Sequence, residues 1–114
     1  MKYSFVYVKH IRDSILSIEE FVKGVSKSDF LHCEKTQDAV VRRLEVMGEA
    51  TKNIPVSFQK KYSDVSWKAM ARMRDKLIHH YFRVDLKVVW EVIKKDLPKL
   101  KKQILKILDE SEEK

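Results

Sequence analysis

Apolar residues recur at alternating steps of three and four along most of this 114-residue chain. The first such stripe runs through Val8, Ile11, Ile15, Ile18, Val22 and Val25, and similar stripes follow over residues 40–54, 67–81 and 86–107. This spacing places the apolar side chains on one face of an α-helix and predicts helices that pack against each other. The chain has only two glycines and two prolines, which is too few for the turns of a many-stranded sheet.

We therefore expect an all-α protein, an up-and-down bundle of four main helices with short connecting helices. Residues 1–114 are long enough for one hydrophobic core and are predicted to form a single domain. Gly24 is expected to end the first long helix and Thr36 to cap the second. The segment 53–55 ends in a proline and should terminate that second helix.

The second half of the chain carries its own boundary signals. Ser66 is expected to cap a helix that begins at Trp67, and Asp85 is expected to cap the last long helix. Pro98 lies inside the periodic stripe of that last helix, so a kink or a restart of the helix is predicted near residues 96–97.

The formal net charge of +7 favours polyanionic partners, and nucleic acid is the first candidate. A lysine-rich solvated surface, as in heat-adapted proteins, is the equally weighted alternative. The single cysteine, Cys33, excludes an internal disulfide and is expected to be a buried thiol; no metal or other cofactor is predicted. The apolar run at the N-terminus is too short for a signal peptide or a membrane span, so a cytoplasmic protein is expected.

Three chemically capable side chains lie at fixed spacing in one stretch: Arg74, His79 and Tyr81. Arg74 falls on the apolar stripe of its helix, and a desolvated guanidinium needs an anionic or hydrogen-bonding partner. Glu49 is a candidate partner, although it can equally be an ordinary surface carboxylate. Gly48 beside it indicates either the close approach of another helix or a site that needs room.

Arg74 and His79 are five residues apart, which on a regular helix means a rotation of about 140° and a separation of about 7.5 Å along the axis. They do not point at one spot from one such helix. Either the helix unwinds near His79, or a second copy of the chain completes the site, and we favour the second copy.

Histidine can take a proton from a ribose 2′-hydroxyl or give one to a leaving oxygen, and arginine offers forked donors to phosphate oxygens. The pair suits RNA cleavage without a metal, and DNA lacks the attacking hydroxyl. The alternative is structural: an arginine paired with a carboxylate, and two histidines placed at a helix end.

The order Arg74, four residues, His79, one residue, Tyr81 resembles the signature of the HEPN ribonuclease superfamily. The chain is similar, over most of its length, to the HepT toxins of HepT/MNT toxin–antitoxin modules. The segments that carry the likeness are 36–40, 47–50, 66–67 and 79–82. His80 and Asp75 depart from the commonest family residues, glycine and asparagine, without affecting the core pair.

This resemblance implies a helical homodimer with a composite cleft and a metal-independent endoribonuclease that leaves 2′,3′-cyclic phosphate ends. Arg74 and His79 would be catalytic and Asp75 supporting. The implied partner is a nucleotidyltransferase antitoxin, as in a type VII-like toxin–antitoxin system, which transfers AMP to Tyr81. Nearby basic residues that could contact RNA are Arg72, Lys76, His80 and Arg83.

The rival hypothesis is a non-catalytic HEPN dimer that binds a nucleotide or a nucleotidyltransferase partner, with Arg74 only recognising phosphate. A helical DNA-binding protein is less favoured because no helix-turn-helix pattern is present.

Overall fold

The computed structural model describes residues 2–79 and 84–112, and at residues 2, 79 and 112 it describes the backbone alone. All regular elements within these ranges are helices, so the all-α prediction is confirmed. The long helices are α1 (Lys2–Val22), α3 (Glu34–Lys52) and α5 (Trp67–His79), followed by a fourth helical stretch in three parts. Those parts are α6 (Leu86–Glu91), the π-helical segment η2 (Val92–Asp96) and α7 (Leu97–Glu112), whereas α2 (Lys27–Leu31) and α4 (Val56–Lys61) are short connecting helices.

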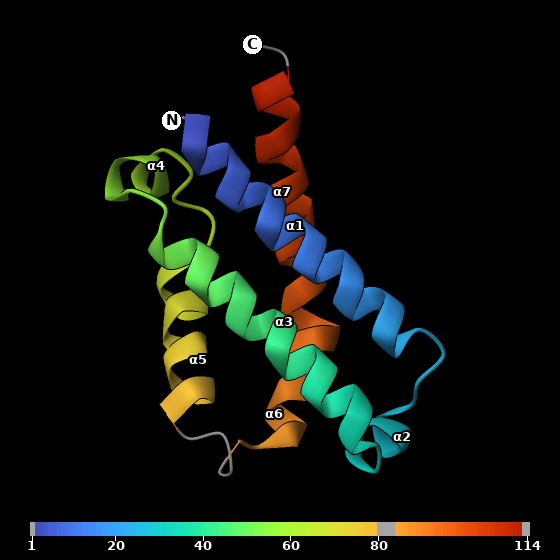
Figure 1. Ribbon diagram of the computed structural model, residues 1–114. Coiled ribbons are helices and arrows are strands. Elements are labelled where there is room, and N and C mark those ends of the chain that lie inside the picture. The colour runs from blue at the N-terminus through green and yellow to red at the C-terminus, as the bar shows by residue number, and fades with distance from the viewer. Residues whose placement is uncertain (1, 80–83, 113–114) are drawn as a thin grey trace.

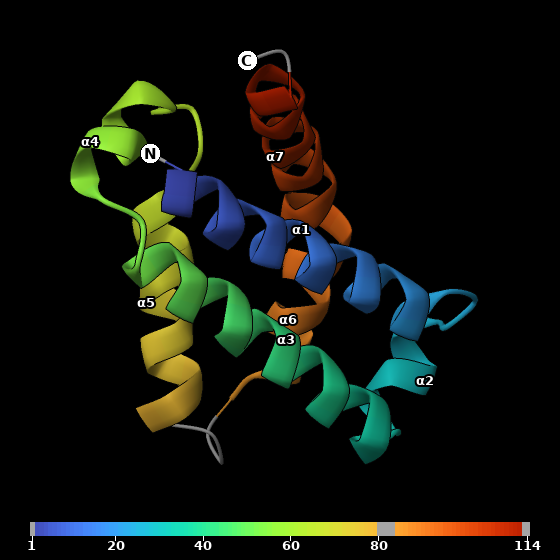
Figure 2. The same ribbon diagram turned by 45° about the horizontal axis from the view of Figure 1, so that its top comes forward.

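The helices form two layers. α1 and α3 lie side by side and antiparallel in the front layer of Figure 1. α5 and the stretch from α6 to α7 lie behind them, and the tilted view of Figure 2 keeps this order. α5 packs against α3, and α7 packs against α1. This is the expected up-and-down bundle.

The predicted stripe of α1 forms the centre of the core. Val8, Ile11, Ile15 and Ile18 are completely buried, and Val22 is nearly so. The helix ends as predicted at Gly24, whose φ of +71° lies in the left-handed region that glycine adopts without strain. The spacing of the apolar residues therefore predicted the buried face of α1, and Gly24 predicted the end of the helix.

The start of α3 differs from the prediction. Its N-cap is Cys33 rather than Thr36, and no side-chain hydrogen bond caps it. The Thr36 hydroxyl lies 3.2 Å from Cys33 Sγ, and this contact holds the pKa of the thiol below its ordinary value. Cys33 is half-buried, so the expectation of a buried thiol was also wrong. The preceding α2 is capped by Ser26, which forms a reciprocal capping box with Asp29.

The later boundaries agree with the sequence. α3 ends at Lys52, before Pro55, and α5 begins at Trp67. The carboxylate of Asp85 accepts a hydrogen bond from Lys87 N–H at 2.9 Å and caps α6.

The kink predicted near Pro98 takes the form of the π-helical segment η2. The N–H of Leu97 bonds to the carbonyl of Val92, five residues back, immediately before the proline. Proline lacks an N–H and its ring crowds the carbonyl four residues back, so a wider turn relieves both problems.

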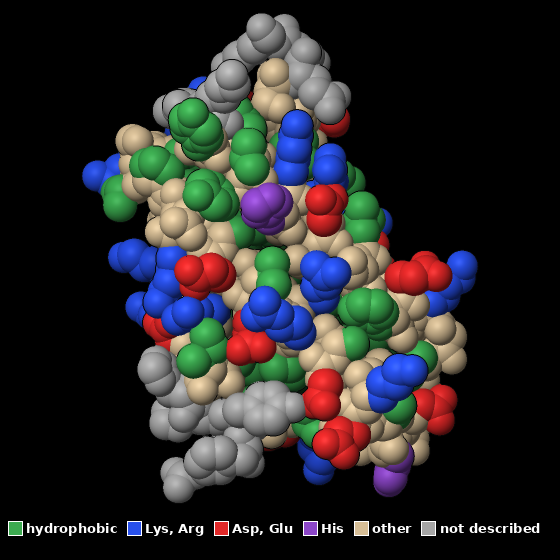
Figure 3. Space-filling model, viewed as in Figure 1, with side chains coloured by type: hydrophobic (Ala, Val, Ile, Leu, Met, Phe, Trp, Pro, Cys, Tyr) green, Lys and Arg blue, Asp and Glu red, His purple; other side chains and the backbone are tan. Residues whose placement is uncertain are grey.

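The face of α1 and α3 carries side chains of mixed charge (Figure 3). Hydrophobic side chains gather on it near the start of α1, whereas basic and acidic side chains alternate over α3. Within residues 2–79 and 84–112, no helix combines the length and apolar character needed to cross a membrane.

Candidate active site

Helix α5 approaches α3 closely at Gly48. Close approach of another helix was one of the two interpretations of this glycine. Gly48 is buried, and a Cβ atom placed on it would overlap Arg74 Cβ. The same atom would lie 2.9 Å from Arg74 Cγ and from the carbonyl oxygen of Met70. The absent side chain therefore allows α5 to bring Arg74 against the adjacent residues of α3.

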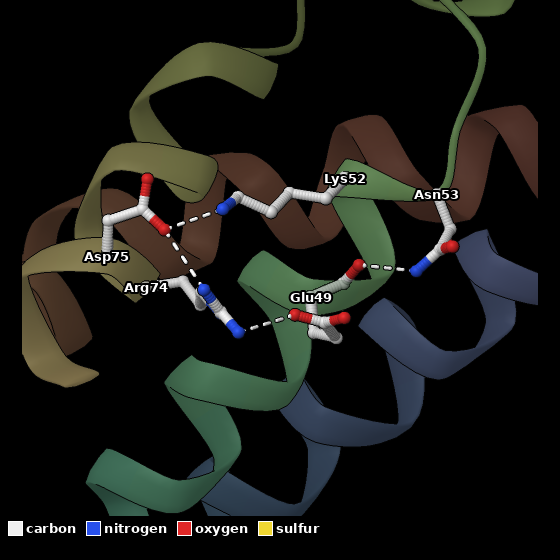
Figure 4. Close-up of polar contacts among 5 residues, drawn as sticks. All are labelled: Glu49, Lys52, Asn53, Arg74 and Asp75. Carbon is white, nitrogen blue, oxygen red and sulfur yellow. Dashed lines mark hydrogen bonds and ion pairs between the residues drawn. The ribbon is translucent and has the colours of Figure 1, made fainter.

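Arg74 lies in a chain of four charged side chains from α3 and α5 (Figure 4). Its Nη2 atom lies 2.9 Å from Glu49 Oε2, and its Nη1 atom lies 3.1 Å from Asp75 Oδ1. Lys52 Nζ reaches the same Asp75 oxygen at 2.7 Å. The pairing of Arg74 with Glu49 is thus confirmed. Two cations and two anions balance, so a phosphate entering here would have to displace a carboxylate from Arg74.

The guanidinium is mostly enclosed: 23% of the Arg74 side chain is exposed. Its Nε atom is buried and has no hydrogen-bond partner within the described ranges. A partly desolvated guanidinium interacts more strongly with an anion than a fully hydrated one does. Arg74 can therefore bind a phosphate firmly once Glu49 moves away.

Asp75 is held in its ionised form. Hydrogen bonds from Lys52, and then from Arg74, lower the pKa of its carboxyl below the ordinary value of 3.8. An ionised carboxylate fixes one side of the Arg74 guanidinium; the supporting role of Asp75 in catalysis stays a prediction.

Replacing Asp75 with asparagine is expected to destabilise the protein near pH 7 and to have progressively less effect toward pH 3. The pKa of Asp75 is lower in the folded state, so its stabilising contribution is present above the ordinary value of 3.8 and is lost as the pH falls through the folded value. Urea unfolding of both proteins at the two pH values measures this. Asp109→Asn, at an exposed position of α7, is the matched control. If Asp75→Asn remains less stable than the wild type by the same amount at low pH, the charge of Asp75 is not the cause of the lost stability.

A cavity of about 270 Å³ opens beside Arg74, between α1, α3 and α5. The apolar stripe over residues 67–81 includes Ile78 and predicted a buried position there, but Ile78 lines this cavity and is 42% exposed, so that prediction was wrong. Trp67 and Leu77 of the same stripe are buried as expected, and Met70 is half-buried.

His79 is the last residue of α5, and the backbone is α-helical from Arg74 through His79. The helix therefore does not unwind between the two residues. A regular helix rotates residues five apart by about 140°, so the backbone positions of Arg74 and His79 lie on different faces of α5.

Of the remaining predicted residues, the two that the structure describes do not lie on the same face of α5 as Arg74. Arg72 and Lys76 are exposed on α5, and residues two apart on a helix are rotated by about 200°. His80, Tyr81 and Arg83 lie outside the described residues. The predicted RNA contacts of the four basic residues and the predicted role of Tyr81 as AMP acceptor therefore stay predictions.

Several residues that line the cavity were not identified from the sequence. Two are the ring side chains Tyr7 and His10 of α1. Three more, Arg42, Glu45 and Asn53, lie with Glu49 on one stripe of α3, at steps of three and four that could have been noticed as a polar helix face. Only Glu49 of that stripe was singled out.

The fold and the motif together define a class of protein. An all-α bundle that carries Arg74 on its third long helix, with His79 and Tyr81 following at the characteristic spacing, has the features of the HEPN superfamily. A model of the family described as "Ribonuclease HepT-like" matches residues 11–107. The chain belongs to this family.

Curated relatives agree with this assignment. The chain is 48% identical over 101 residues to a "Probable ribonuclease HepT" of Thermococcus cleftensis, which covers 89% of this chain and 92% of the relative. It is 46% identical over 108 residues to a "Putative RNase" of Caldanaerobacter subterraneus, and this match covers 95% of this chain and 96% of the relative. It is also 52% identical over 105 residues to a "Gamma-glutamylcyclotransferase and putative RNase" of Methanocaldococcus jannaschii. That match covers 92% of this chain but only 47% of the relative, so the chain spans about half of that protein's length. No solved structure gave a significant match.

Proposed function

We propose that this chain is an endoribonuclease that needs no metal ion. The 2′-oxygen of a ribose attacks the adjacent phosphorus, the bond from phosphorus to the 5′-oxygen breaks, and a 2′,3′-cyclic phosphate forms. One proton leaves the attacking hydroxyl and one is delivered to the leaving 5′-oxygen. Family membership and the names of the relatives support the ribonuclease class.

The observation that carries the proposal is the half-buried Arg74 guanidinium beside an open cavity. In the free protein Glu49 and Asp75 occupy its donors. The scissile phosphate takes the place of Glu49, which is 56% exposed and free to turn away. Arg74 then holds a non-bridging oxygen and stabilises the charge that develops on the phosphorane.

His79 supplies the proton transfers, and the rotation between Arg74 and His79 on one helix favours a site completed by a second copy of the chain. A symmetric homodimer brings two copies of each residue to its axis. One neutral His79 accepts the proton of the 2′-hydroxyl, and the other, protonated, gives a proton to the leaving oxygen. Histidine titrates near pH 6.5, so both forms are accessible near neutrality.

The test of this function is RNA cleavage by the purified protein in the presence of EDTA. We expect cleavage to continue in EDTA, to leave cyclic phosphate ends, and to spare DNA of the same sequence. Cleavage that EDTA abolishes would contradict the metal-independent mechanism. Equal cleavage of DNA would contradict attack by the 2′-hydroxyl.

A second candidate function is that of a non-catalytic dimer that binds a nucleotide or a nucleotidyltransferase. The ion pairs that Arg74 makes with two carboxylates favour it, because they are also what a purely structural arginine would make. Nucleotide binding without any RNA cleavage by unmodified protein would support this candidate.

We further propose that the protein is the toxin of a toxin–antitoxin pair, neutralised by a nucleotidyltransferase. The Tyr81 hydroxyl attacks the α-phosphorus of ATP, loses its proton and receives AMP, and pyrophosphate leaves. An added phosphodiester places bulk and negative charge where the RNA phosphate must bind.

Incubation with ATP and such a nucleotidyltransferase should add AMP to Tyr81 and stop RNA cleavage. Peptide mass spectrometry locates the modification, and Tyr81→Phe should remain unmodified. Tyr3 is 79% exposed and serves as the internal control for unspecific transfer to surface tyrosines. Modification of Tyr3 to the same extent as Tyr81 would contradict a specific acceptor.

A further inference from the structure

The cavity beside Arg74 has the size of a site for one small ligand. Its volume of about 270 Å³ is slightly below the range of about 300–1,000 Å³ that is typical of small-molecule pockets. Three helices build its walls, and Arg74 and Glu49 belong to its lining. A group bound there is therefore adjacent to the guanidinium that binds phosphate in the function proposed above.

One wall of the cavity is aromatic. The rings of Tyr7 and His10 on α1 lie 5.9 Å apart between centroids, with an interplanar angle of 89°. In this edge-to-face arrangement one ring presents only its edge to the other, so its own two faces stay free of the pair. A free aromatic face is the feature on which unpaired RNA bases stack.

The part of the lining that α3 supplies contains hydrogen-bond acceptors. Glu45 makes no ion pair or hydrogen bond within the described ranges, so its carboxylate can accept from a ligand. Asn53 Nδ2 donates to the carbonyl oxygen of Glu49 at 3.0 Å, which leaves its side-chain oxygen as a second acceptor. Arg42, on the same stripe of α3, adds a cation for a neighbouring phosphate.

We propose that this cavity binds the base on the 5′ side of the scissile phosphate and favours guanine. The base stacks on the free face of one of these two perpendicular rings and meets the other ring at its edge, and the Glu45 carboxylate accepts hydrogen bonds from the N1 and N2 positions of guanine. Uracil presents carbonyl oxygens on either side of its single N–H, and these repel a carboxylate. This inference rests on the proposed ribonuclease function, because Arg74 would then hold the 3′-phosphate of the same nucleotide.

Isothermal titration of the wild-type protein with guanosine 3′-monophosphate and uridine 3′-monophosphate tests the proposal, since neither ligand can be cleaved. We expect the guanosine nucleotide to bind about tenfold more tightly, in the range seen for one good bidentate base contact. Glu45→Gln keeps the size of the side chain but replaces one acceptor with a donor, and should remove most of this preference. His10→Ala should lower the affinity for both nucleotides about tenfold, because it removes one of the two rings against which the base packs.

Tyr3→Ala is the matched control, because Tyr3 lies one helical turn from Tyr7 on α1, is 79% exposed and does not line the cavity. It should leave both affinities unchanged. Equal affinity for the two nucleotides in the wild type, or an unchanged preference in Glu45→Gln, would overturn the proposal. If the preference is present but RNA is not cleaved, the proposed ribonuclease function fails while the guanine site stands.

Discussion

His79→Ala and Arg74→Ala should each reduce RNA cleavage by about 10²–10⁴-fold, the range expected when a general acid–base group is removed. For His79 the reason is the loss of both proton transfers. For Arg74 it is the loss of the donors that hold the phosphate and the charge of the transition state. Initial rates on a labelled single-stranded RNA measure the effect. Thermal unfolding confirms that the variants are folded.

Lys68→Ala is the matched control for this experiment, because Lys68 is an exposed cation of the same helix, α5. Its removal should change the rate only slightly. If Lys68→Ala loses as much activity as Arg74→Ala, the effect of Arg74 is general electrostatic attraction of RNA rather than catalysis.

Mixing the two inactive variants examines the composite site directly. A mixed dimer has one copy with an intact Arg74 and another with an intact His79. If the reacting Arg74 and His79 come from two different chains, mixing should raise the activity above that of either variant, but only in part, because the mixed dimer keeps one His79 and therefore one of the two proton transfers. If activity returns in neither fresh mixtures nor co-expressed protein, the two residues do not act across a dimer.

Gly48→Ala should lower the free energy of unfolding by about 2 kcal/mol and the melting temperature by roughly 8 °C. Helix propensity alone predicts the opposite sign, a gain of about 1 kcal/mol from replacing glycine inside a helix. The new Cβ, however, would overlap Arg74 Cβ and crowd the carbonyl of Met70, so α5 must move away from α3. Denaturant unfolding of Gly48→Ala and the wild type measures the sign of the change in the free energy of unfolding. A more stable Gly48→Ala variant would contradict the close contact.

The other glycine of the chain offers a contrast. A Cβ at Gly24 would meet nothing within 4 Å, but its positive φ makes any L-residue strained there. Gly24→Ala should therefore destabilise by about 1–2 kcal/mol without changing RNA cleavage. Gly48→Ala should reduce both stability and cleavage, because it displaces Arg74 from Glu49.

Much of the fold could be predicted because its causes are local. The apolar spacing along α1, the left-handed turn at Gly24 and the Asp85 cap each depend on residues within one or two helical turns. The cap of α3 was missed because Thr36 has the right chemistry for a cap but lies inside the first turn of the helix. Several residues there can begin the helix with similar energies, and packing chooses among them.

The sequence by itself determined a helical bundle, the buried face of its first helix and the motif that brings Arg74, His79 and Tyr81 together in one short segment. Only the tertiary structure decided that Arg74 contacts Glu49, that Lys52 contacts Asp75, and that Tyr7 and Glu45 face one cavity. The reason is that these contacts join helices separated along the chain. Their register depends on how α3 and α5 cross at Gly48, which follows from packing of the whole core and not from the periodicity of either helix.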